Sequence, residues 1–236
     1  MGTGVEMKRN LPALVGALLS AALLSACGSA PDVSDTTVAA EATRNLFTSG
    51  FGLASKPAST APTGARLQAI QTALAQSAVP VYGVKVDKLR FNGFVAPYGI
   101  NGSIRTWAST AYQTVSMNDG VLVATRGFGS DMMSAVAPSI GQISSGNGFF
   151  HRVYYYLDGA DQPQRLDFDC NFATAGSETI DLYGQGYVAR RVNESCANPD
   201  TRFENAYWFD GSGKLRQSDQ FVSVQVATMR LQRLVD

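Results

Sequence analysis

The sequence is short of the residues that most often carry catalysis and metal binding. Its 236 residues include one histidine, two tryptophans and three cysteines. It contains no Cys-x-x-Cys, no His-Glu-x-x-His and no Gly-x-Ser-x-Gly, which are signatures of thiol or zinc sites, metalloproteases and serine hydrolases. We therefore predict a protein that is not an enzyme and that needs no metal or other cofactor.

An excess of charge of either sign is also missing. Lys and Arg number 19, Asp and Glu number 19, and no run of basic residues is present. Since proteins bind nucleic acid mainly by neutralising phosphates, nucleic acid is not an expected partner. The apolar fraction of 45% and the charged fraction of 16% are typical of a folded globular chain.

A hydrophobic run long enough to cross a bilayer is absent too. The apolar stretch Leu11–Leu24 is shorter than the ~20 residues that a transmembrane helix needs. Lys8 and Arg9 precede it, and Leu-Ser-Ala-Cys27 ends it. This pattern predicts a secretory signal peptide over residues 1–26. Cysteine after Leu-Ser-Ala is the lipobox, so we predict acylation, with palmitate among the chains, at Cys27. A transmembrane helix with a chance cysteine is the alternative.

Lipidation at Cys27 would make a membrane the first partner of the protein. Several acyl chains hold a protein stably at a bilayer. Because Gly28 rather than Asp follows the cysteine, we expect an outer-membrane anchor in a bacterial envelope, with the chain facing the periplasm. Residues 27–36 then form a lipidated tether. Residues 37–236 form a single β-rich periplasmic domain, a length that suits one domain.

Two cysteines remain after Cys27 is assigned to lipid. In an exported chain, Cys170 and Cys196 most simply form one disulfide. A thiol site is the alternative. Each of the two cysteines lies at or just beyond the end of a predicted strand, and Tyr183–Gly186 between them suits a hairpin turn. A bridge across the open end of that hairpin would hold the strand register.

Hydrophobic spacing predicts helices over Val38–Phe47 and Ala65–Ser77, and one or two helical turns within residues 131–145. After Pro80, β-branched and aromatic residues alternate with polar ones between Gly-rich turns. This predicts a mainly β fold, an antiparallel β-sandwich or partly open barrel with one or two N-terminal helices. The expected strands are Tyr82–Val86, Leu89–Val95, Ile104–Ala108, Gln113–Met117, Val121–Arg126, Phe149–Leu157, Gln164–Phe172, Glu178–Tyr183, Tyr187–Glu194, Arg202–Phe209, Leu215–Phe221 and Val224–Leu234.

Several separated motifs then resemble one known family. They occur in the same order and cover most of the chain, from Val38 to Leu234. Family members usually carry Trp where this chain has Phe221. The motifs are Asp119–Ala135, Tyr154–Gly159, the aromatic-Asp-Cys at Phe168–Cys170, Phe203–Asp210, Gly213 and Arg216–Ser223. On these residues the chain resembles the YjbF/GfcB family of bacterial lipoproteins.

The resemblance implies an outer-membrane lipoprotein encoded with exopolysaccharide or group 4 capsule genes, and a mostly β domain in the periplasm. It implies no reaction, because the family has no agreed catalytic residues to carry over. The signal peptide and the fold class follow from the residues alone, whereas the polysaccharide role follows from the resemblance.

Candidate ligand-binding residues are aromatics and arginines near strands and turns. Exposed aromatic rings stack on sugars, and arginines bind anionic sugars through paired hydrogen bonds. Core packing is the alternative for the aromatics, and ion pairs of Arg126 with Asp131 and of Arg216 with Asp219 are the alternative for the arginines. The candidates are Trp107, Arg126, Tyr155, Trp208 and Arg216.

The single histidine and a local group of carboxylates are of residue types that can act in catalysis. His151 lacks a motif that would supply a nucleophile and an orienting carboxylate. Paired carboxylates can cleave glycosidic bonds or bind calcium, yet turn and surface roles are the expected ones here. The carboxylates concerned are Asp158, Asp161, Asp167 and Asp169.

These observations favour a lipid-anchored, non-enzymatic accessory protein in the production or export of extracellular or capsular polysaccharide. It would act by binding polymer or polysaccharide-export proteins. One alternative is a carrier of a hydrophobic ligand, such as a lipid, inside an open β-barrel. A second is a glycan-modifying enzyme, which would need two carboxylates in a cleft at glycosidase separation.

Overall fold

A computed structural model describes residue 2 and residues 64–236 of the chain. The expected signal peptide, the lipidation site Cys27, the tether 27–36 and the helix expected at Val38–Phe47 lie outside the described residues. The described helices are α2 (Gly64–Ala75), the 3-10 helix η1 (Asp87–Leu89) and α3 (Ile140–Ser144). None of them is long and apolar enough to cross a bilayer.

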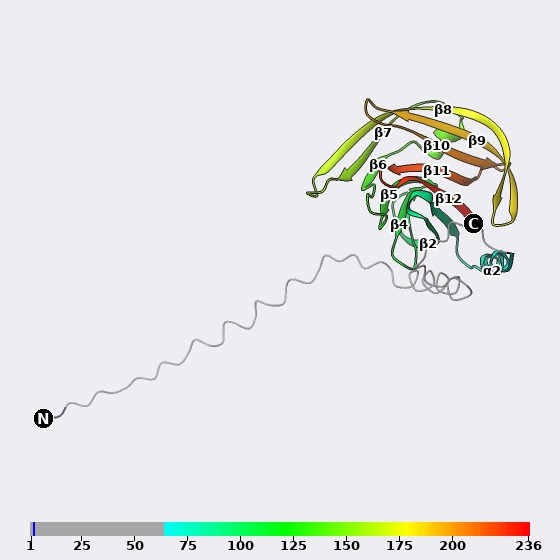
Figure 1. Ribbon diagram of the computed structural model, residues 1–236, viewed down its shortest axis with the longest axis horizontal. Helices are drawn as coiled ribbons and strands as arrows, with labels where there is room; N and C mark the ends of the chain where they lie inside the picture. Colours follow the sequence, from blue (N-terminus) through cyan, green and yellow to red (C-terminus); the bar gives the residue numbers. More distant parts are fainter. Residues whose placement is uncertain (1, 3–63) are drawn as a thin grey trace. The chain divides into compact units, whose positions relative to one another are not determined.

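All strands of the described part belong to one antiparallel sheet of twelve strands, in the order β5-β4-β3-β2-β1-β12-β11-β10-β9-β8-β7-β6 (Figure 1). The strands are β1 (Val81–Val86), β2 (Phe91–Asn101), β3 (Ile104–Ala108), β4 (Thr114–Asn118), β5 (Val121–Arg126), β6 (Ser134–Val136), β7 (Asn147–Leu157), β8 (Pro163–Leu182), β9 (Gln185–Ala197), β10 (Arg202–Asp210), β11 (Leu215–Ser223) and β12 (Ala227–Val235).

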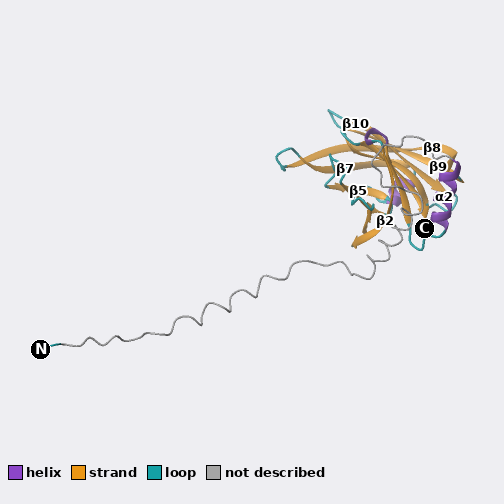
Figure 2. Cartoon of the chain, turned by 60° about the horizontal axis from the view of Figure 1, so that its bottom comes forward, coloured by secondary structure: helices purple, strands orange, loops and turns teal. Residues whose placement is uncertain are grey.

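The sheet is strongly curled (Figure 2), and its two edge strands, β5 and β6, contact each other. The amide of Thr125, at the end of β5, donates to the carbonyl of Met132, just before β6, over 2.9 Å. The result is a nearly closed, barrel-shaped sheet. The predicted mainly β, partly open barrel is therefore confirmed.

Tight turns follow the pattern that the sequence predicts. Asp119 and Gly120 have φ angles of 50° and 89°, and Tyr183 and Gly184 have 55° and 90°. Two successive positive φ angles belong to the type I′ turn that joins twisted antiparallel strands. At Gly120 the positive φ favours glycine, and a Cβ there would also lie 2.9 Å from the end of the Leu215 side chain, which would have to shift.

One predicted break in the strands is wrong. Gln164–Phe172 and Glu178–Tyr183 are parts of a single strand, β8, rather than two strands. The register between β8 and β9 shifts between Thr174 and Ser177, and Gly176 there has a φ of 95°. A bulge of this kind bends a strand without ending its ladder, so a glycine in this position does not mark a turn.

The interior of the barrel is filled by side chains. Gln220 crosses it: its side-chain oxygen accepts from the amide of Leu122 at 2.9 Å, and its amide donates to the carbonyl of Gly120 at 2.8 Å. These bonds hold the β4–β5 hairpin against β11. The apolar side chains packed around them include Tyr82, Val84, Val95, Trp107, Val115, Met117, Leu122, Met229 and Leu231.

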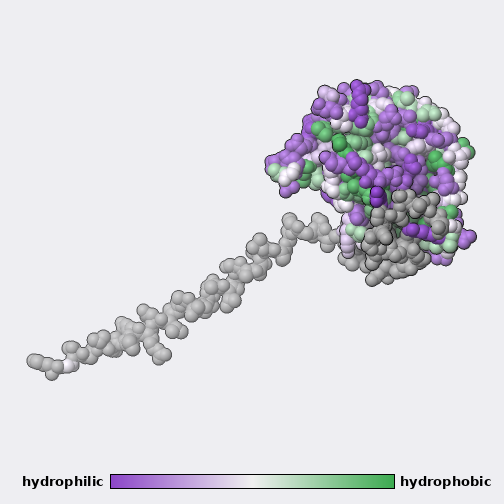
Figure 3. All heavy atoms as spheres, viewed as in Figure 1, coloured by the Kyte–Doolittle hydropathy of each residue, from purple (hydrophilic) through white to green (hydrophobic). Residues whose placement is uncertain are grey.

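Helix α2 covers one end of the barrel. Its Ile70 packs with Val81 and Phe94, and its Gln71 side chain donates to the carbonyl of Tyr183 in the β8–β9 turn over 2.8 Å. The β11–β12 turn lies at the other end of β12, and the β7–β8 hairpin extends away from the barrel (Figure 1). On the face seen in Figure 3, hydrophilic and hydrophobic residues are interleaved.

Candidate functional site

A groove lies between the β7–β8 hairpin and the β11–β12 turn, at the end of the barrel away from α2. Its volume is about 310 Å³, which is at the small end of the range for ligand sites. We call it the mouth groove. It is lined by Ser130, Tyr156, Leu157, Gln164, Leu166, Phe168, Thr201, Phe221, Ser223, Val224 and Gln225.

The walls of the mouth groove are aliphatic and its polar groups are neutral. Leu157, Leu166 and Val224 are 43%, 38% and 59% exposed, which is high for aliphatic side chains. The lining side chains that can hydrogen-bond have hydroxyl or amide groups, and no lining residue carries a charge. The groove therefore offers apolar contact and neutral hydrogen bonds.

Aromatic rings form the floor of the mouth groove. Phe203 and Phe221 stack with their ring centres 4.3 Å apart, and Phe168 meets Phe203 edge-on at 5.0 Å. The hydroxyl of Tyr156 donates to the carbonyl of Val222 over 2.6 Å and so ties β7 to β11. Burial raises the pKa of Tyr156, so this hydroxyl remains a donor at physiological pH.

The three consecutive tyrosines of β7 divide between the two faces of the sheet. Tyr154 and Tyr156 face the interior and the groove. Tyr155, the residue predicted to bind ligand, alternates with them and pairs across the sheet with the exposed Arg165. Its place is the outer face, outside the groove. The sequence predicts the split, because side chains alternate along a strand, but it does not tell which tyrosine faces inward.

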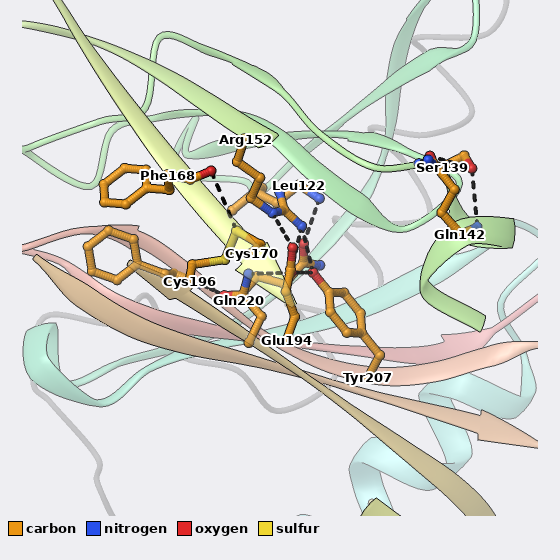
Figure 4. A network of polar contacts seen from close by, with 12 residues as sticks. Leu122, Ser139, Gln142, Arg152, Phe168, Cys170, Glu194, Cys196, Tyr207 and Gln220 are labelled. Carbon is orange, nitrogen blue, oxygen red and sulfur yellow. Dashed lines mark hydrogen bonds and ion pairs between the residues drawn. A yellow bond between two sulfur atoms is a disulfide. The ribbon is translucent and has the colours of Figure 1, made fainter. Parts of the chain in front are cut away.

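A buried polar network lies beneath this floor (Figure 4). Arg152 donates two hydrogen bonds, of 2.6 and 2.8 Å, to the carboxylate of Glu194, and both side chains are almost completely buried. The hydroxyl of Tyr207 and the amide of Asn205 also donate to Glu194, at 2.9 and 2.8 Å. Asn205 in turn accepts from the amide of Phe221 at 2.7 Å. The network thus joins β7, β9, β10 and β11.

The predicted disulfide is present next to this network. Cys170 and Cys196 are direct partners in the β8–β9 register, with Cα atoms 4.1 Å apart, and both are buried. Among the described residues, Cys170, Glu194 and Cys196 form the one group close enough to share a metal ion. The disulfide and the pairing of Glu194 with Arg152 occupy these atoms, so the group offers no free ligand set.

Both candidate tryptophans are core residues. Trp107 and Trp208 are each 5% exposed. Trp107 meets Tyr82 edge-on at 4.7 Å, and the indole nitrogen of Trp208 donates to Glu178 over 2.6 Å. Neither ring presents the open face that stacking on a sugar needs. The core-packing alternative describes both.

Arg126 does not make the ion pair with Asp131 that was the alternative to ligand binding. Its guanidinium donates to the backbone carbonyls of Met132 and Met133 at 3.1 and 3.2 Å. Asp131 instead accepts from the hydroxyl of Thr125 at 2.7 Å and from the amide of Gly127 at 2.8 Å. The arginine and the aspartate therefore fasten the same β5–β6 connection separately, through backbone groups that the sequence does not reveal.

Arg216 forms ion pairs, as in the alternative to ligand binding, but with carboxylates other than Asp219. It contacts Asp210 at 2.6 Å and Asp236 at 3.1 Å. Asp219 pairs with Arg230 of β12 at 2.7 Å. The alternative pair of Arg216 with Asp219 is not formed, because neighbouring strands rather than neighbouring residues supply the partners. Arg126 and Arg216 both lie outside the lining of the mouth groove.

The histidine and the carboxylates lie on the outer face of the β7–β8 hairpin and at its tip. The two ring nitrogens of His151 lie 2.9 Å from Asp169 and 2.9 Å from Asp167. These hydrogen bonds raise the pKa of His151. Hydrogen bonds from Arg165 and then from His151 lower the pKa of Asp167. The cluster is solvent-exposed and outside the groove.

Asp158 has a turn role. Its carboxylate accepts from the amides of Ala160 and Gln162 at 2.8 and 2.9 Å. These bonds lower the pKa of Asp158, which is the opposite of what a general acid needs.

Sequence reasoning missed the residues that shape the groove, chiefly Tyr156, Leu166 and Val224. Leucine and valine on strands carry no signal of their own, since most such residues are buried. Leu166 lies between charged residues, and its strand, β8, begins several residues before it pairs with the next strand, β9. Only the register of β8 with β9 shows that Leu166 lies in the unpaired part.

One solved structure has a similar fold. The crystal structure of the lipoprotein YmcC from Escherichia coli (K12) is similar with a TM-score of 0.63 and 16% identity, covering 70% of this chain and 88% of that chain. A Bacteroides fragilis protein described as having a YmcC-like fold gives a TM-score of 0.28 and 7% identity, over 66% of this chain and 92% of that chain. No curated protein sequence matches significantly.

A protein family matches most of the sequence. Its description reads group 4 capsule polysaccharide lipoprotein gfcB, YjbF, and the match covers residues 40–234. This range includes every strand of the sheet except the last residue of β12, and it includes the buried network and every residue of the mouth groove. The chain belongs to the YjbF family of group 4 capsule polysaccharide lipoproteins.

Proposed function

We propose that this protein is a lipid-anchored, non-enzymatic accessory protein in the production or export of an extracellular or capsular polysaccharide. The observation that carries the proposal is the family match over residues 40–234. In this proposal the protein acts by binding polymer or an export partner, and the mouth groove is the binding site. The groove is open and apolar-walled, with neutral hydrogen-bonding groups at its rim.

Two alternatives are less well supported. A carrier of a lipid inside the barrel needs an internal cavity, whereas the described interior holds a cluster of buried apolar side chains. A glycosidase needs two carboxylates facing each other across a cleft, one with a raised pKa. Asp158 and Asp167 instead have lowered pKa values, and the described residues that line the groove include no carboxylate.

The proposed location follows from Cys27. With acyl chains at this residue and Gly28 after it, the protein would be held at the outer membrane with its β domain in the periplasm, where exported polymer passes.

Deletion of the gene is expected to lower surface polysaccharide severalfold, and wild-type protein supplied in trans is expected to restore it. Cys27→Ala protein is expected to restore it poorly, because an unanchored domain is diluted through the periplasm. Extracted surface polysaccharide, quantified per cell, is the measurement, with immunoblots to match protein levels. Normal polymer in the deletion strain would refute the proposed function; full rescue by Cys27→Ala would refute only the role of the anchor.

A further inference from the structure

The β7–β8 hairpin extends beyond the next strand of the sheet. The first pair between β8 and β9 is Asp169 with Ala197, whereas β8 already begins at Pro163 and pairs with β7 from there. Residues 163–168 therefore have a strand neighbour on one side only. This open edge borders the mouth groove, whose lining includes Gln164, Leu166 and Phe168 from the same six residues.

The hydrogen-bonding pattern tells which backbone groups point to the open side. The amide of Asp158 donates to the carbonyl of Gln162 at 3.0 Å, and the carbonyl of Tyr155 accepts from Met133, on the other side of β7, at 2.8 Å. Hydrogen-bonded and non-hydrogen-bonded pairs alternate along an antiparallel ladder. Arg165, the partner of Tyr155, therefore belongs to a non-hydrogen-bonded pair.

By the same alternation Asp167 also turns its backbone away from β7. The short Cα distance of 4.1 Å between Cys170 and Cys196 agrees with this alternation. Close Cα atoms mark a non-hydrogen-bonded pair, so at Cys170 the backbone groups point to β7 rather than to β9. The N–H and C=O groups of Arg165 and Asp167 thus point to the open edge. Among the hydrogen bonds that residues 64–236 make outside the strand ladders, none reaches these four groups. Pro163 has no N–H to donate, so it limits strand pairing at one end of the edge. No bulge interrupts residues 164–168, and bulges are one of the devices that keep edge strands from pairing.

The two faces beside this edge differ in character. Side chains at alternate positions face the mouth groove, where Leu166 is 38% exposed. The intervening side chains, Arg165 and Asp167, lie with His151 on the charged outer face. A strand added to the edge would place every second side chain against the groove and the others against charged groups.

We infer that the open edge of β8 and the mouth groove together accept an extended segment of a partner protein, which adds as a strand and carries apolar residues at alternate positions. Main-chain hydrogen bonds supply affinity in this mode of recognition, and pockets for alternate side chains supply specificity. The inference rests on the proposed function and favours a protein partner over the polymer itself.

The groove suits a polypeptide better than a glycan for two reasons. A row of unpaired amides and carbonyls at strand spacing matches another strand, and a sugar chain has no such repeat. In addition, the exposed walls are aliphatic, whereas Phe168 and Phe221 in the floor are 1% and 8% exposed. A flat aromatic platform for sugar stacking is therefore missing from the described lining.

The test places a photoreactive p-benzoylphenylalanine at Leu166 of the full-length protein in polymer-producing cells. Asp167→Pro removes an amide that points to the open edge and leaves the ladder to β7 intact, since proline is tolerated in an edge strand. Asp167→Ala removes the carboxylate and keeps the amide. We expect a protein adduct attached within one alternating apolar-polar segment, reduced about tenfold by Asp167→Pro and retained by Asp167→Ala.

The same probe at Val188, an exposed residue outside the groove lining, is the control. Four outcomes contradict the inference: an adduct with glycan, an adduct from Val188 as strong as that from Leu166, a yield unchanged by Asp167→Pro, or no adduct. A melting curve checks that Asp167→Pro is folded, and Arg165→Pro probes the second edge amide if it is not. The proposed function fails separately, when deletion leaves polymer unchanged. If deletion abolishes polymer and Asp167→Pro restores it fully, only the inference fails.

Discussion

Arg152→Met is expected to destabilise the fold by about 3–5 kcal/mol, because it leaves the carboxylate of Glu194 buried without its cation. Both side chains are almost completely excluded from solvent, and Glu194 accepts from Arg152, Asn205 and Tyr207. The network also positions Phe221 through Asn205. Its loss should therefore loosen the groove floor as well as the barrel.

Urea unfolding of the purified protein measures this effect. Arg165→Met is the matched control, because Arg165 lies on the same hairpin, pairs with Asp167 and is more than half exposed. Exposed ion pairs contribute about 0–1 kcal/mol. A loss in Arg152→Met no larger than in Arg165→Met would contradict the assigned role of the network.

A second variant separates the charge from the shape of the pair. Replacing both partners, as Arg152→Met with Glu194→Leu, removes the buried charge along with its cation. Apolar replacements of buried ion pairs are often neutral or stabilising, although Tyr207 and Asn205 would here lose an acceptor. The double variant should therefore recover a large part of the stability that Arg152→Met loses.

Removing the disulfide is the second change with a large expected effect. Cys170 and Cys196 lie 26 residues apart in sequence and close the loop that contains the β8–β9 hairpin. In the chain-entropy treatment, a loop of this length contributes about 3–4 kcal/mol by restricting the unfolded chain. For a domain of this size the melting temperature should fall by roughly 6–16 °C.

The paired variant Cys170→Ala with Cys196→Ala, melted beside the wild type with and without reductant, measures this contribution. Because both sulfurs are buried, reductant alone should act on the folded wild type slowly, and the variant should show no response to it. An equal melting temperature for variant and oxidised wild type would contradict a stabilising bridge.

The sequence predicts the strands and turns of this fold better than it predicts which side chains contact one another. Asn118-Asp119-Gly120 announces a type I′ turn in the residues themselves, and the structure has one there. The continuity of β8 through Gly176 could not be predicted, because a glycine at a bulge and a glycine at a turn look alike in one sequence. The strand continues because β9 runs alongside it on both sides of the bulge.

The candidate site was harder to predict, since it depends on which strands curl toward each other. Cys170 and Cys196 could be paired by counting, but Trp107 and Trp208 show that a conspicuous residue type need not be exposed. The mouth groove arises where β7 and β8 face the β11–β12 turn, more than fifty residues later in the chain. Tyr156 acquires its partner, Val222, only through that closure.

In the proposed function, the mouth groove is the surface through which this protein acts in polysaccharide production or export. The direct measurement is surface polysaccharide in the deletion strain supplied with Leu166→Asp combined with Val224→Asp, which charges both aliphatic walls. Val188→Asp, at a residue 72% exposed and outside the groove lining, is the control. We predict that the control restores polymer and that the groove variant, present at the same level, does not. Full restoration by the groove variant would contradict the claim.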